Sequence, residues 1–364
     1  MAGLTASVRS AQPFGLRQTD LVSLELMGKG GHGVERICVL VNDEITEDVL
    51  PRVEAVDAQI SAIYVGRILT AEIDGDAGAK AEMDRLLATA EVYAGRRIPA
   101  DIVQRSPRLK WVQNTRTGVD KMLLDSAFRK GPIVLTNVTA VHSYGPAELA
   151  MLACLAHVKD MRACERQKEE RRWQPFWTEV LWGKTMGIIG YGSIGERVAR
   201  IAKAFDMRVL ATRKTVRTAS RTRHVDLLLP AAELDRLLSE SDFVVLCTPL
   251  TPETHHLIGA PQFAAMKRNA LFINISRGPT VDEAALAVAL RDGWIAAAAL
   301  DVFEEEPLPL ESPLWELPNV MCSPHIGGNV PSYAAMVQEL FLRNLAHYVR
   351  GERLECLVNK RRGY

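Results

Sequence analysis

Short apolar segments rich in β-branched residues alternate with amphipathic segments through the first third of the chain. The apolar segments predict strands, and segments of helical periodicity between them predict helices at Glu47–Val56 and Ala79–Thr89. Strands that alternate with helices are typical of a parallel sheet with helices on both faces. The predicted strands are Ile37–Val41, Ile60–Val65, Ala90–Ala94, Leu109–Gln113 and Ile133–Leu135.

The segment Ala147–Gln174 has no internal glycine or proline, which predicts one long helix. At 1.5 Å per residue it would extend roughly 40 Å, long enough to link two domains. Its first half is apolar, whereas Arg162–Arg172 is heavily charged. We interpret the charged half as a solvated or subunit-facing surface rather than a nucleic-acid patch.

A second series of strands and helices follows and predicts a second doubly wound parallel sheet. The strands are Met186–Ile189, Arg208–Ala211, Phe243–Cys247, Leu271–Ile275 and Ile295–Leu300; the helices are Ser193–Phe205, Ala231–Ser239, Pro261–Met266 and Val281–Arg291. The last amphipathic segment, Ser332–Arg350, has apolar positions suited to packing on the first sheet. We therefore expect an α/β protein in which residues 141–329 form one domain, inserted into another made of 35–140 and 330–364. Residues 1–34 show no sustained period and predict a flexible or loosely docked tail.

Three glycines, Gly190, Gly192 and Gly195, form G-x-G-x-x-G between the strand Met186–Ile189 and the helix Ser193–Phe205. In a dinucleotide site the first glycine allows the tight turn, the second the approach of a pyrophosphate, and the third close packing of helix on strand. The pyrophosphate lies against the free N–H groups of the helix N-terminus. A bare structural turn is the alternative, but the strand before and the helix after favour a dinucleotide site.

Charge and cysteine content exclude several classes of protein. Lys+Arg and Asp+Glu both number 44, so the zero net charge argues against a nucleic-acid binder. No apolar run approaches the roughly 18 residues of a membrane span. The six cysteines form no C-x-x-C pair, which indicates free thiols in a reducing compartment, the cytoplasm, and no metal site.

Polar residues follow several predicted strands of the second series: Thr248, Ser276-Arg277-Gly278 and Asp301. Ligands of doubly wound sheets bind outside the carboxyl ends of the strands, so these residues are candidates for a site.

Several segments carry a resemblance: LKWVQNTRTGVDKM, GYGSIG, LTPETHHLI, INISRGPTVDE, ALDVFEEEPLP and CSPHIGG. From about Leu109 to its last residue the chain resembles an NAD(P)-dependent D-isomer-specific 2-hydroxyacid dehydrogenase of the glyoxylate/hydroxypyruvate reductase kind. The resemblance implies a Rossmann cofactor domain inserted into a flavodoxin-like substrate domain. It also implies a homodimer, for which we expect Ala147–Gln174 at the subunit contact.

The resemblance assigns catalysis to Arg277, Glu306 and His325, and the chemistry of a 2-oxoacid asks for such a set. Hydride transfer to the carbonyl carbon leaves an anionic oxygen, for which histidine is a suitable proton donor. A carboxylate favours the charged ring and orients it, and arginine can bind the substrate carboxylate with both arms of its fork. Glu306 follows Glu304 and Glu305, so the alternative is that all three are solvated surface charges. Its position directly before Pro307 matches the family motif and favours Glu306 as the catalytic carboxylate. His255 and His256 are expected at the surface or in packing.

The motif and the resemblance together predict the contacts of cofactor and substrate. Asp301 would hold the nicotinamide carboxamide, with a turn residue as the alternative. Arg116 stands where many relatives have a small residue; it would either contact a larger or dianionic substrate or point into solvent. The predicted cofactor residues are Gly190, Tyr191, Gly192, Ser193, Ile194, Gly195, Thr212, Arg213, Lys214, Thr248, Thr254, Ile275, Ser276, Arg277, Asp301 and His325; the substrate residues are Thr117, Gly118 and Arg277.

Cofactor choice rests on the residues after the second strand of the cofactor domain. NAD-using relatives have Asp where this chain has Arg213, and no acidic residue occurs from Met207 to Ser220. Arg213, Lys214 and Arg217 suit a 2′-phosphate, with Thr212 as a neutral donor, so we expect NADP. The alternative is that they are solvated loop charges and that NAD is still accepted.

The resemblance also narrows the substrate. Formate-oxidising relatives carry Gln in place of Glu306, which disfavours formate as the substrate. Serine-pathway relatives carry a regulatory extension at the C-terminus, and none follows Tyr364 here, which disfavours an enzyme of that kind. We therefore expect a small 2-oxoacid, glyoxylate or hydroxypyruvate. The alternative is a dinucleotide-sensing, corepressor-like binding protein of the same fold; the absence of an obvious peptide-docking segment favours the enzyme.

Overall fold

The computed structural model describes residues 36–99 and 101–364. Apart from Arg36, these residues belong to one unit that runs from Ile37 to Tyr364. The tail expected at residues 1–34 lies outside the described residues.

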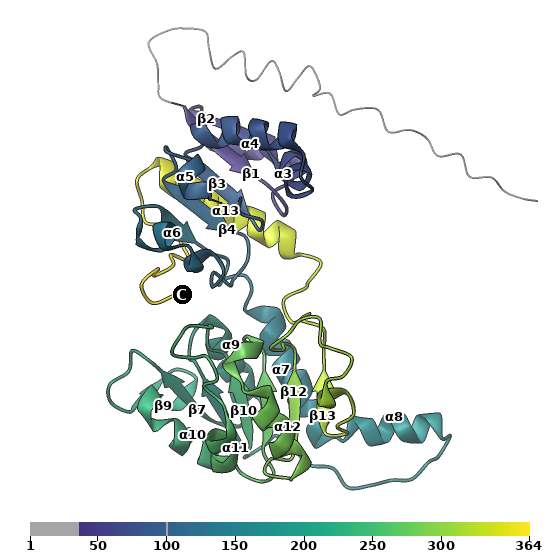
Figure 1. The fold of residues 1–364 in the computed structure, drawn as a ribbon. Coiled ribbons are helices and arrows are strands. Elements are labelled where there is room, and N and C mark those ends of the chain that lie inside the picture. Colours follow the sequence, from purple (N-terminus) through teal and green to yellow (C-terminus); the bar gives the residue numbers. More distant parts are fainter. Residues whose placement is uncertain (1–35, 100) are drawn as a thin grey trace, which may run out of the picture. The chain divides into compact units, whose positions relative to one another are not determined.

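A five-stranded parallel sheet carries the order β2-β1-β3-β4-β5 (Figure 1). Counted along the chain this is 2-1-3-4-5, the flavodoxin-like order, as the resemblance implied. All five strands predicted in this region are confirmed, within a residue or two at their ends. They are β1 (Ile37–Val41), β2 (Ile60–Tyr64), β3 (Val92–Gly95), β4 (Trp111–Asn114) and β5 (Val134–Thr136).

Helices cover both faces of this first sheet. One face packs against α3, α4, α5 and α6, and the other against α2 and the distant α13. Phe341 and Leu345 of α13 are fully buried, and the ring of Phe341 lies 5.7 Å from that of Trp111 in β4. The expected return of the last helix to the first sheet is therefore confirmed. The elements are η1 (Glu47–Val49), α2 (Leu50–Glu54), α3 (Gly66–Ile73), α4 (Ala77–Thr89), α5 (Ile102–Arg105), η2 (Met122–Leu124), α6 (Ser126–Lys130) and α13 (Tyr333–Val349).

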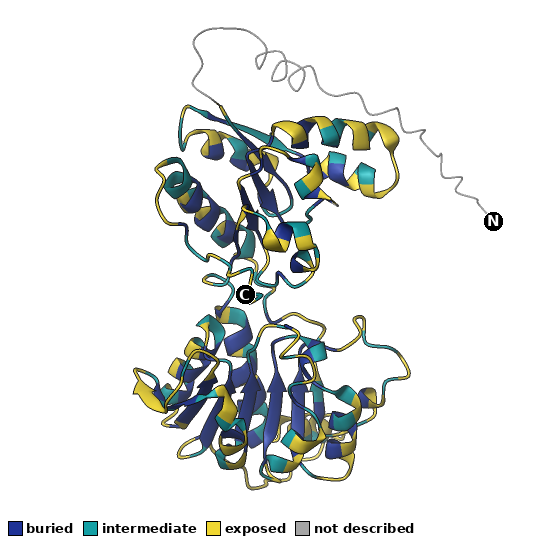
Figure 2. Ribbon diagram, turned by 60° about the vertical axis from the view of Figure 1, so that its left-hand side comes forward, coloured by how far each residue is buried: buried dark blue, intermediate teal, exposed yellow. Residues whose placement is uncertain are grey.

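An eight-stranded sheet follows the order β13-β12-β11-β10-β6-β7-β9-β8, with only the β8–β9 pair antiparallel. Its central six strands have the 3-2-1-4-5-6 order of the Rossmann fold. Figure 2 shows that the central strands are buried, as expected for parallel strands covered on both faces. The strands are β6 (Thr185–Ile189), β7 (Arg208–Arg213), β8 (Ser220–Thr222), β9 (Val225–Pro230), β10 (Phe243–Leu246), β11 (Leu271–Asn274), β12 (Ala297–Leu300) and β13 (Val320–Cys322).

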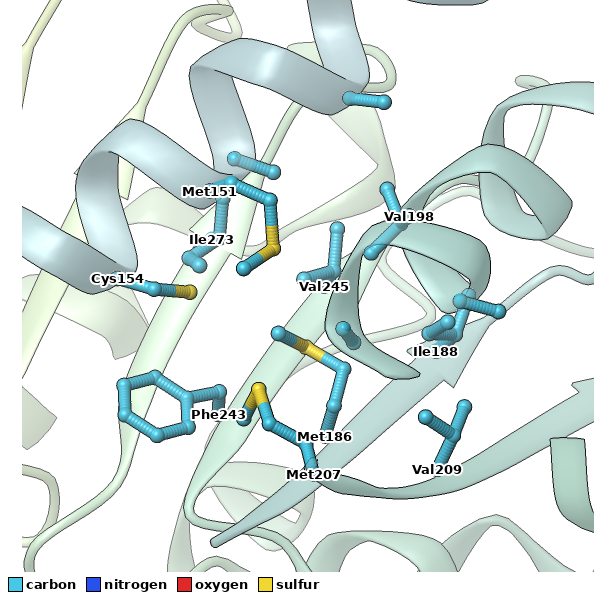
Figure 3. Close-up of a cluster of buried hydrophobic side chains, with 14 of the residues drawn as sticks. Met151, Cys154, Met186, Ile188, Val198, Met207, Val209, Phe243, Val245 and Ile273 are labelled. Carbon is cyan, nitrogen blue, oxygen red and sulfur yellow. The ribbon is translucent and has the colours of Figure 1, made fainter. Parts of the chain in front are cut away.

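The two faces of this second sheet pack against different helices. Residues of α7 and α9 fill one face, where Met151 and Cys154 lie over Met186 and Phe243 of the strands (Figure 3). Residues of α10, α11 and α12 fill the other. The elements are α7 (Tyr144–Val158), α8 (Met161–Glu169), α9 (Ser193–Ala204), η3 (Ala231–Glu233), α10 (Leu234–Glu240), α11 (Ala260–Ala265), η4 (Gly278–Thr280), α12 (Glu283–Arg291) and η5 (Pro313–Trp315).

The single long helix predicted at Ala147–Gln174 is wrong. The chain forms α7 and α8, separated at Asp160, which adopts a left-handed φ of 43°. Aspartate tolerates this conformation, and its side chain accepts a hydrogen bond from the Ala163 N–H at 3.1 Å. Asp160 therefore ends one helix and caps the next.

Several elements have no counterpart in the sequence prediction, among them the helices α3, α5 and α6 and the strands β8, β9 and β13. β9 matters most, because it pairs with β7 and completes the Rossmann order. β7 also continues to Arg213, two residues beyond the predicted end. Among the described residues, no helix is long and apolar enough to cross a membrane.

Candidate active site

The glycine loop joins β6 to α9 with the geometry expected of a dinucleotide turn. Gly190 has a φ of +97°, which favours glycine, and a Cβ on Gly195 would lie 2.6 Å from the Gly190 carbonyl oxygen. A Cβ on Gly192 would meet no atom within 4 Å, so its face is open to a ligand. The N–H groups of Gly190 and Tyr191 both donate to the Thr212 carbonyl, at 3.2 and 2.9 Å, which fixes the loop on β7. The N-terminus of α9 is thus presented beside an open surface, where a pyrophosphate fits.

One cavity of about 390 Å³, which we call the main cavity, brings together much of the predicted site. Its walls come from loops that follow strands of both sheets, as expected for a ligand site in doubly wound sheets. The predicted residues that line it are Thr117, Gly118, Gly192, Ser193, Ile194, Thr248, Ile275, Ser276, Arg277, Asp301 and His325.

His325 and Glu306 form a close pair at the cavity. His325 Nδ1 lies 2.8 Å from Glu306 Oε2, and the other oxygen, Oε1, accepts the Phe303 N–H at 3.1 Å. The carboxylate therefore fixes the ring through Nδ1 and leaves Nε2 as the nitrogen able to serve a ligand. The neighbouring Glu304 instead pairs with His256 Nε2 at 2.7 Å, away from this histidine.

The loop that carries His325 is held by a buried carboxylate. Asp301 Oδ1 accepts the Ser323 hydroxyl at 2.6 Å and the Ile326 N–H at 2.9 Å, and Oδ2 accepts the Gly327 N–H at 2.8 Å. His325 has a φ of 52°, a left-handed conformation that is uncommon for histidine. Asp301, at the end of β12, thus clamps the loop on both sides of His325.

Arg277 follows β11 and lies against the loop of Thr117 and Gly118. Its Nη1 donates to its neighbour's carbonyl, that of Ser276, at 2.7 Å, and its Nε lies 3.8 Å from Asp120 Oδ1. A Cβ on Gly118 would lie 2.1 Å from Arg277 Nη2, so the guanidinium packs directly on the Gly118 backbone. The guanidinium therefore sits directly beside the predicted substrate loop.

Three buried polar atoms on the wall of the main cavity have no hydrogen-bond partner among the described residues: Thr117 Oγ1, His142 Nδ1 and Thr248 Oγ1. Buried polar groups in folded proteins are almost always paired, so partnerless atoms around one cavity indicate a polar ligand. The open glycine loop, the cationic Arg277 and these atoms fit a nicotinamide dinucleotide and a small anionic substrate.

Sequence reasoning missed His142. It lies after β5, and a Cβ on Gly328 would lie 1.9 Å from its Cε1, so the ring packs on that backbone. Burial, and then the charge of Arg277 and of Arg116, lower the pKa of His142 to about 4. The rule that polar residues gather after strands would have identified it, had it been applied to β5 as it was to the strands of the second series.

Several predicted cofactor residues do not line the main cavity. The buried Thr212 supports the glycine loop through its carbonyl. Thr254 ties its own loop together: its hydroxyl donates to the Pro249 carbonyl at 2.7 Å. The predicted cofactor residues that do not line it are Gly190, Tyr191, Gly195, Thr212, Arg213, Lys214 and Thr254, and the predicted catalytic residue Glu306 does not line it either.

The basic residues after β7 are exposed. Lys214 Nζ lies 3.6 Å from Glu253 Oε1. Within the described part of the chain, the guanidinium groups of Arg213 and Arg217 make no hydrogen bond or ion pair. Arg213, the last residue of β7, is therefore available to an anionic ligand.

The comparisons with known proteins agree with this geometry. Residues 151–327 match the family model described as D-isomer specific 2-hydroxyacid dehydrogenase, NAD binding domain. The chain is 40% identical over 276 residues to a glyoxylate reductase of Pyrococcus furiosus, an alignment that covers 72% of this chain and 80% of that protein.

Two solved structures share the fold. One is a D-isomer specific 2-hydroxyacid dehydrogenase from Xanthobacter autotrophicus in complex with NADPH and MES (TM-score 0.76, 28% identity, 91% of this chain and 100% of that one). The other is an NADPH-dependent glyoxylate/hydroxypyruvate reductase from Sinorhizobium meliloti with NADP and sulfate (TM-score 0.75, 28% identity, 90% and 100%). The chain thus belongs to the D-isomer specific 2-hydroxyacid dehydrogenases, which are NAD(P)-dependent oxidoreductases.

Proposed function

We propose that the protein reduces a small 2-oxoacid, glyoxylate or hydroxypyruvate, with NADPH, giving the D-isomer where the product is chiral. The observation that carries the proposal is that the paired His325 and the guanidinium of Arg277 line the same cavity as the glycine loop. The names of the relatives support it, since one is a glyoxylate reductase and another acts on glyoxylate and hydroxypyruvate.

Each residue of the proposed triad has a separate task. Arg277 binds the substrate carboxylate and polarises the carbonyl, with Thr117 and Gly118 alongside. A bound nicotinamide would supply hydride to the carbonyl carbon. His325 donates a proton from Nε2 to the oxygen as negative charge develops there. Glu306 accepts the Nδ1–H at 2.8 Å, which fixes the orientation of the ring.

For the cofactor, we propose that the glycine loop holds the pyrophosphate and that Arg213, Lys214 and Arg217 hold the 2′-phosphate. The exposed, unpartnered guanidinium of Arg213 supports this assignment. The NADPH and NADP in the two neighbouring structures support it as well. The Glu253 carboxylate near Lys214 weakens that lysine's attraction for phosphate, so Arg213 is expected to contribute most.

The assembly and domain division are part of the same proposal. Residues 141–329 form the cofactor domain, and 35–140 with 330–364 form the substrate domain. The protein is a homodimer with Ala147–Gln174 at the contact, and it works in the cytoplasm. The exposed Leu152 of α7 and Met161 of α8 support a contact there, and the free state of all six cysteines suits a reducing compartment.

The test is a turnover panel with purified protein. With glyoxylate or hydroxypyruvate, we expect kcat/KM to be at least tenfold higher for NADPH than for NADH, and Arg213→Asp to reverse the preference. Asp at that position removes an attraction for the 2′-phosphate and adds a repulsion. The exposed Arg85, on α4, provides a matched control as Arg85→Asp.

Two results would contradict the proposal in different ways. Equal kcat/KM for the two cofactors would overturn the assignment of Arg213. Tight NADPH binding without turnover of any 2-oxoacid would instead favour a dinucleotide-sensing protein.

A further inference from the structure

A second cavity of about 370 Å³, the distal cavity, adjoins the main one. The two share His142 and Gly328, so the imidazole and this backbone stand at their junction. The remaining wall of the distal cavity includes Arg96, Arg116, Glu44 and Tyr333. Arg116 is the position that the sequence left open between a substrate contact and solvent.

Arg116 has an uncommitted positive charge. Its backbone N–H donates to Asn114 Oδ1 at 3.2 Å, but its guanidinium makes no hydrogen bond or ion pair within the part of the chain that the structure describes. The residue is exposed, and it lines the distal cavity. A guanidinium in this position has all its donors free for a ligand.

Arg96 is nearly as free, because the carboxylates near it are engaged elsewhere. It lies 3.8 Å from both Asp43 Oδ1 and Glu44 Oε1, too far for a hydrogen bond. Asp43 is bound more closely by Arg97, whose Nε lies 2.9 Å from Oδ1 and whose backbone N–H lies 3.0 Å from Oδ2. Glu44 Oε2 accepts the Thr115 hydroxyl at 2.6 Å. Among the residues that the structure describes, two guanidinium groups thus face this cavity and one carboxylate, that of Glu44, lies in its wall.

His142, at the junction, and Tyr333, in the wall of the distal cavity, lie in the electrostatic field of the neighbouring arginines. The positive charges of Arg277, in the main cavity, and Arg116, in the distal one, both disfavour protonation of His142. The charges of Arg116 and Arg96 both act on the Tyr333 hydroxyl, which donates to the Thr115 carbonyl. The positive field therefore continues from the catalytic arginine past a neutral ring to the two distal arginines.

We propose that the distal cavity is a subsite for a second anionic group of the substrate, held by Arg116 and Arg96. This inference rests on the proposed function, and it names the substrate class more closely: 2-oxoacids whose chain ends in a carboxylate or a phosphate. The 2-oxoacid end lies on Arg277, and the chain passes His142 and Gly328 to the distal arginines. Because arginine can bind either anion with two parallel hydrogen bonds, both end groups suit the subsite.

The experiment compares substrates that differ only in the distal charge. One pair, 2-oxoglutarate and its neutral terminal amide 2-oxoglutaramate, tests a terminal carboxylate. The other pair, hydroxypyruvate phosphate and the neutral-ended hydroxypyruvate, tests a terminal phosphate. The quantity measured is the ratio of kcat/KM for the charged and neutral member, in wild type, Arg116→Gln, Arg96→Gln and Arg116→Lys. Calorimetric Kd values for the same pairs, measured without cofactor, give a second ratio that requires no turnover.

We expect wild type to favour the charged member of at least one pair by tenfold or more. Each glutamine variant should lower that ratio at least fivefold, and Arg116→Lys should lower it less, since it keeps the charge. Arg129→Gln, on the exposed face of α6 and outside both cavities, is the matched control and should leave the ratio unchanged.

The possible results distinguish a failure of the subsite proposal from a failure of the proposed reductase function. If glyoxylate is reduced but neither ratio changes in Arg116→Gln or Arg96→Gln, the subsite is wrong and the proposed function stands. If no 2-oxoacid is reduced, the proposed function is wrong. The ratio of Kd values for the charged and neutral members then tests the subsite, and a ratio that is the same in wild type and all variants would overturn it.

Discussion

The proposed role of Arg277 depends on how few contacts its guanidinium makes with the rest of the protein. Arg277 uses Nη1 on the Ser276 carbonyl and has only a long contact, 3.8 Å, to Asp120. The rest of its fork faces the wall formed by Thr117 and Gly118. A planar fork can bind a carboxylate with two hydrogen bonds, whereas a lysine ammonium acts as a point charge.

Arg277→Lys should therefore raise KM for the 2-oxoacid strongly and lower kcat, although the charge is kept. We expect a loss of at least tenfold in kcat/KM, measured by steady-state NADPH oxidation. Arg129→Lys is a matched control on an exposed helix face. Equal kinetics for lysine and arginine at residue 277 would show that charge alone matters and would remove the bidentate contact from the account.

His142 gives the folded state a defined pH dependence. Burial, Arg277, Arg116 and His325 lower its pKa to about 4 from an ordinary value of 6.5, and Asp301 acts in the opposite direction. Between these two pH values the unfolded chain binds a proton at this position that the folded chain does not bind. The free energy of unfolding should thus fall as the pH is lowered from about 6.5 to about 4, by up to about 3 kcal/mol from this group.

His142→Gln should flatten that decline, as measured by urea unfolding at pH 7 and pH 5. The matched control is His224→Gln, at the half-buried residue before β9. If the difference in unfolding free energy between the two pH values is the same in wild type and in His142→Gln, the histidine is not held neutral by its surroundings.

At the residue scale, the sequence predicted what short motifs encode. The triad and the glycine loop stand in contiguous segments, and the structure brings Arg277, His325 and Gly192 to one cavity with Glu306 paired behind the histidine. His142 and Arg96 were not predicted, because they lie outside the motifs that carried the resemblance. They follow β5 and β3 of the first sheet, to which the rule on polar residues after strands was not applied.

At the element scale, the segment after β12 and the loop after β13 act as one unit. Asp301 accepts two backbone N–H groups and one hydroxyl from residues 323–327, and Glu306 pairs with His325 from the other side. A Cβ on Gly278 would lie 1.8 Å from the Phe303 carbonyl carbon, so the Arg277 loop packs directly on this segment. All three side chains of the proposed triad are thus positioned by contacts between neighbouring loops.

Asp301→Ala should remove the hydrogen bonds that hold the His325 loop, and it would also remove any contact that Asp301 makes with the cofactor. We expect the amide hydrogens of Ile326 and Gly327 to exchange at least tenfold faster in the free protein, and kcat to fall. Asp242→Ala is the control, because Asp242 accepts the Thr185 N–H at 2.8 Å in another part of the sheet. Unchanged exchange at Ile326 and Gly327 would show that the clamp is not what holds the loop.

The elements that the sequence predicted well are those with strong, uninterrupted patterns. The central strands β6, β10 and β11 are continuous apolar runs, and they were found. β9 was missed because a short apolar run such as Leu227–Leu229 fits a strand or a helix equally well, and its strand character comes from pairing with β7. The break at Asp160 was missed because helix periodicity continues across it, while one left-handed residue ends the helix.

At the scale of the whole molecule, an exposed aromatic segment after α8 bears on assembly. Trp173 and Trp177 are 95% and 101% exposed, respectively, and Trp182 is 72% exposed. Large apolar side chains left exposed in one stretch of the chain are candidates for an interface. Trp173 lies in the segment Ala147–Gln174, which we propose as the subunit contact, and Trp177 and Trp182 follow it.

The protein should therefore be a homodimer at micromolar concentration, with twice the mass of one chain by light scattering. Trp173→Ser combined with Trp177→Ser should raise the dimer dissociation constant at least tenfold. Trp315→Ser, which is 54% exposed and lies in η5, serves as the control. A monomeric wild type, or a double variant that dimerises normally, would contradict this assignment.

The central claim is that His325, oriented by Glu306, protonates a 2-oxoacid reduced by NADPH at the main cavity. The most direct test follows NADPH absorbance with hydroxypyruvate, identifies the product isomer, and compares wild type with His325→Gln. The account predicts D-glycerate from wild type, and a kcat lowered by about 10²–10⁴ in the variant with NADPH affinity kept. L-glycerate as the product, or a variant with more than about a third of the wild-type kcat at neutral pH, would contradict it.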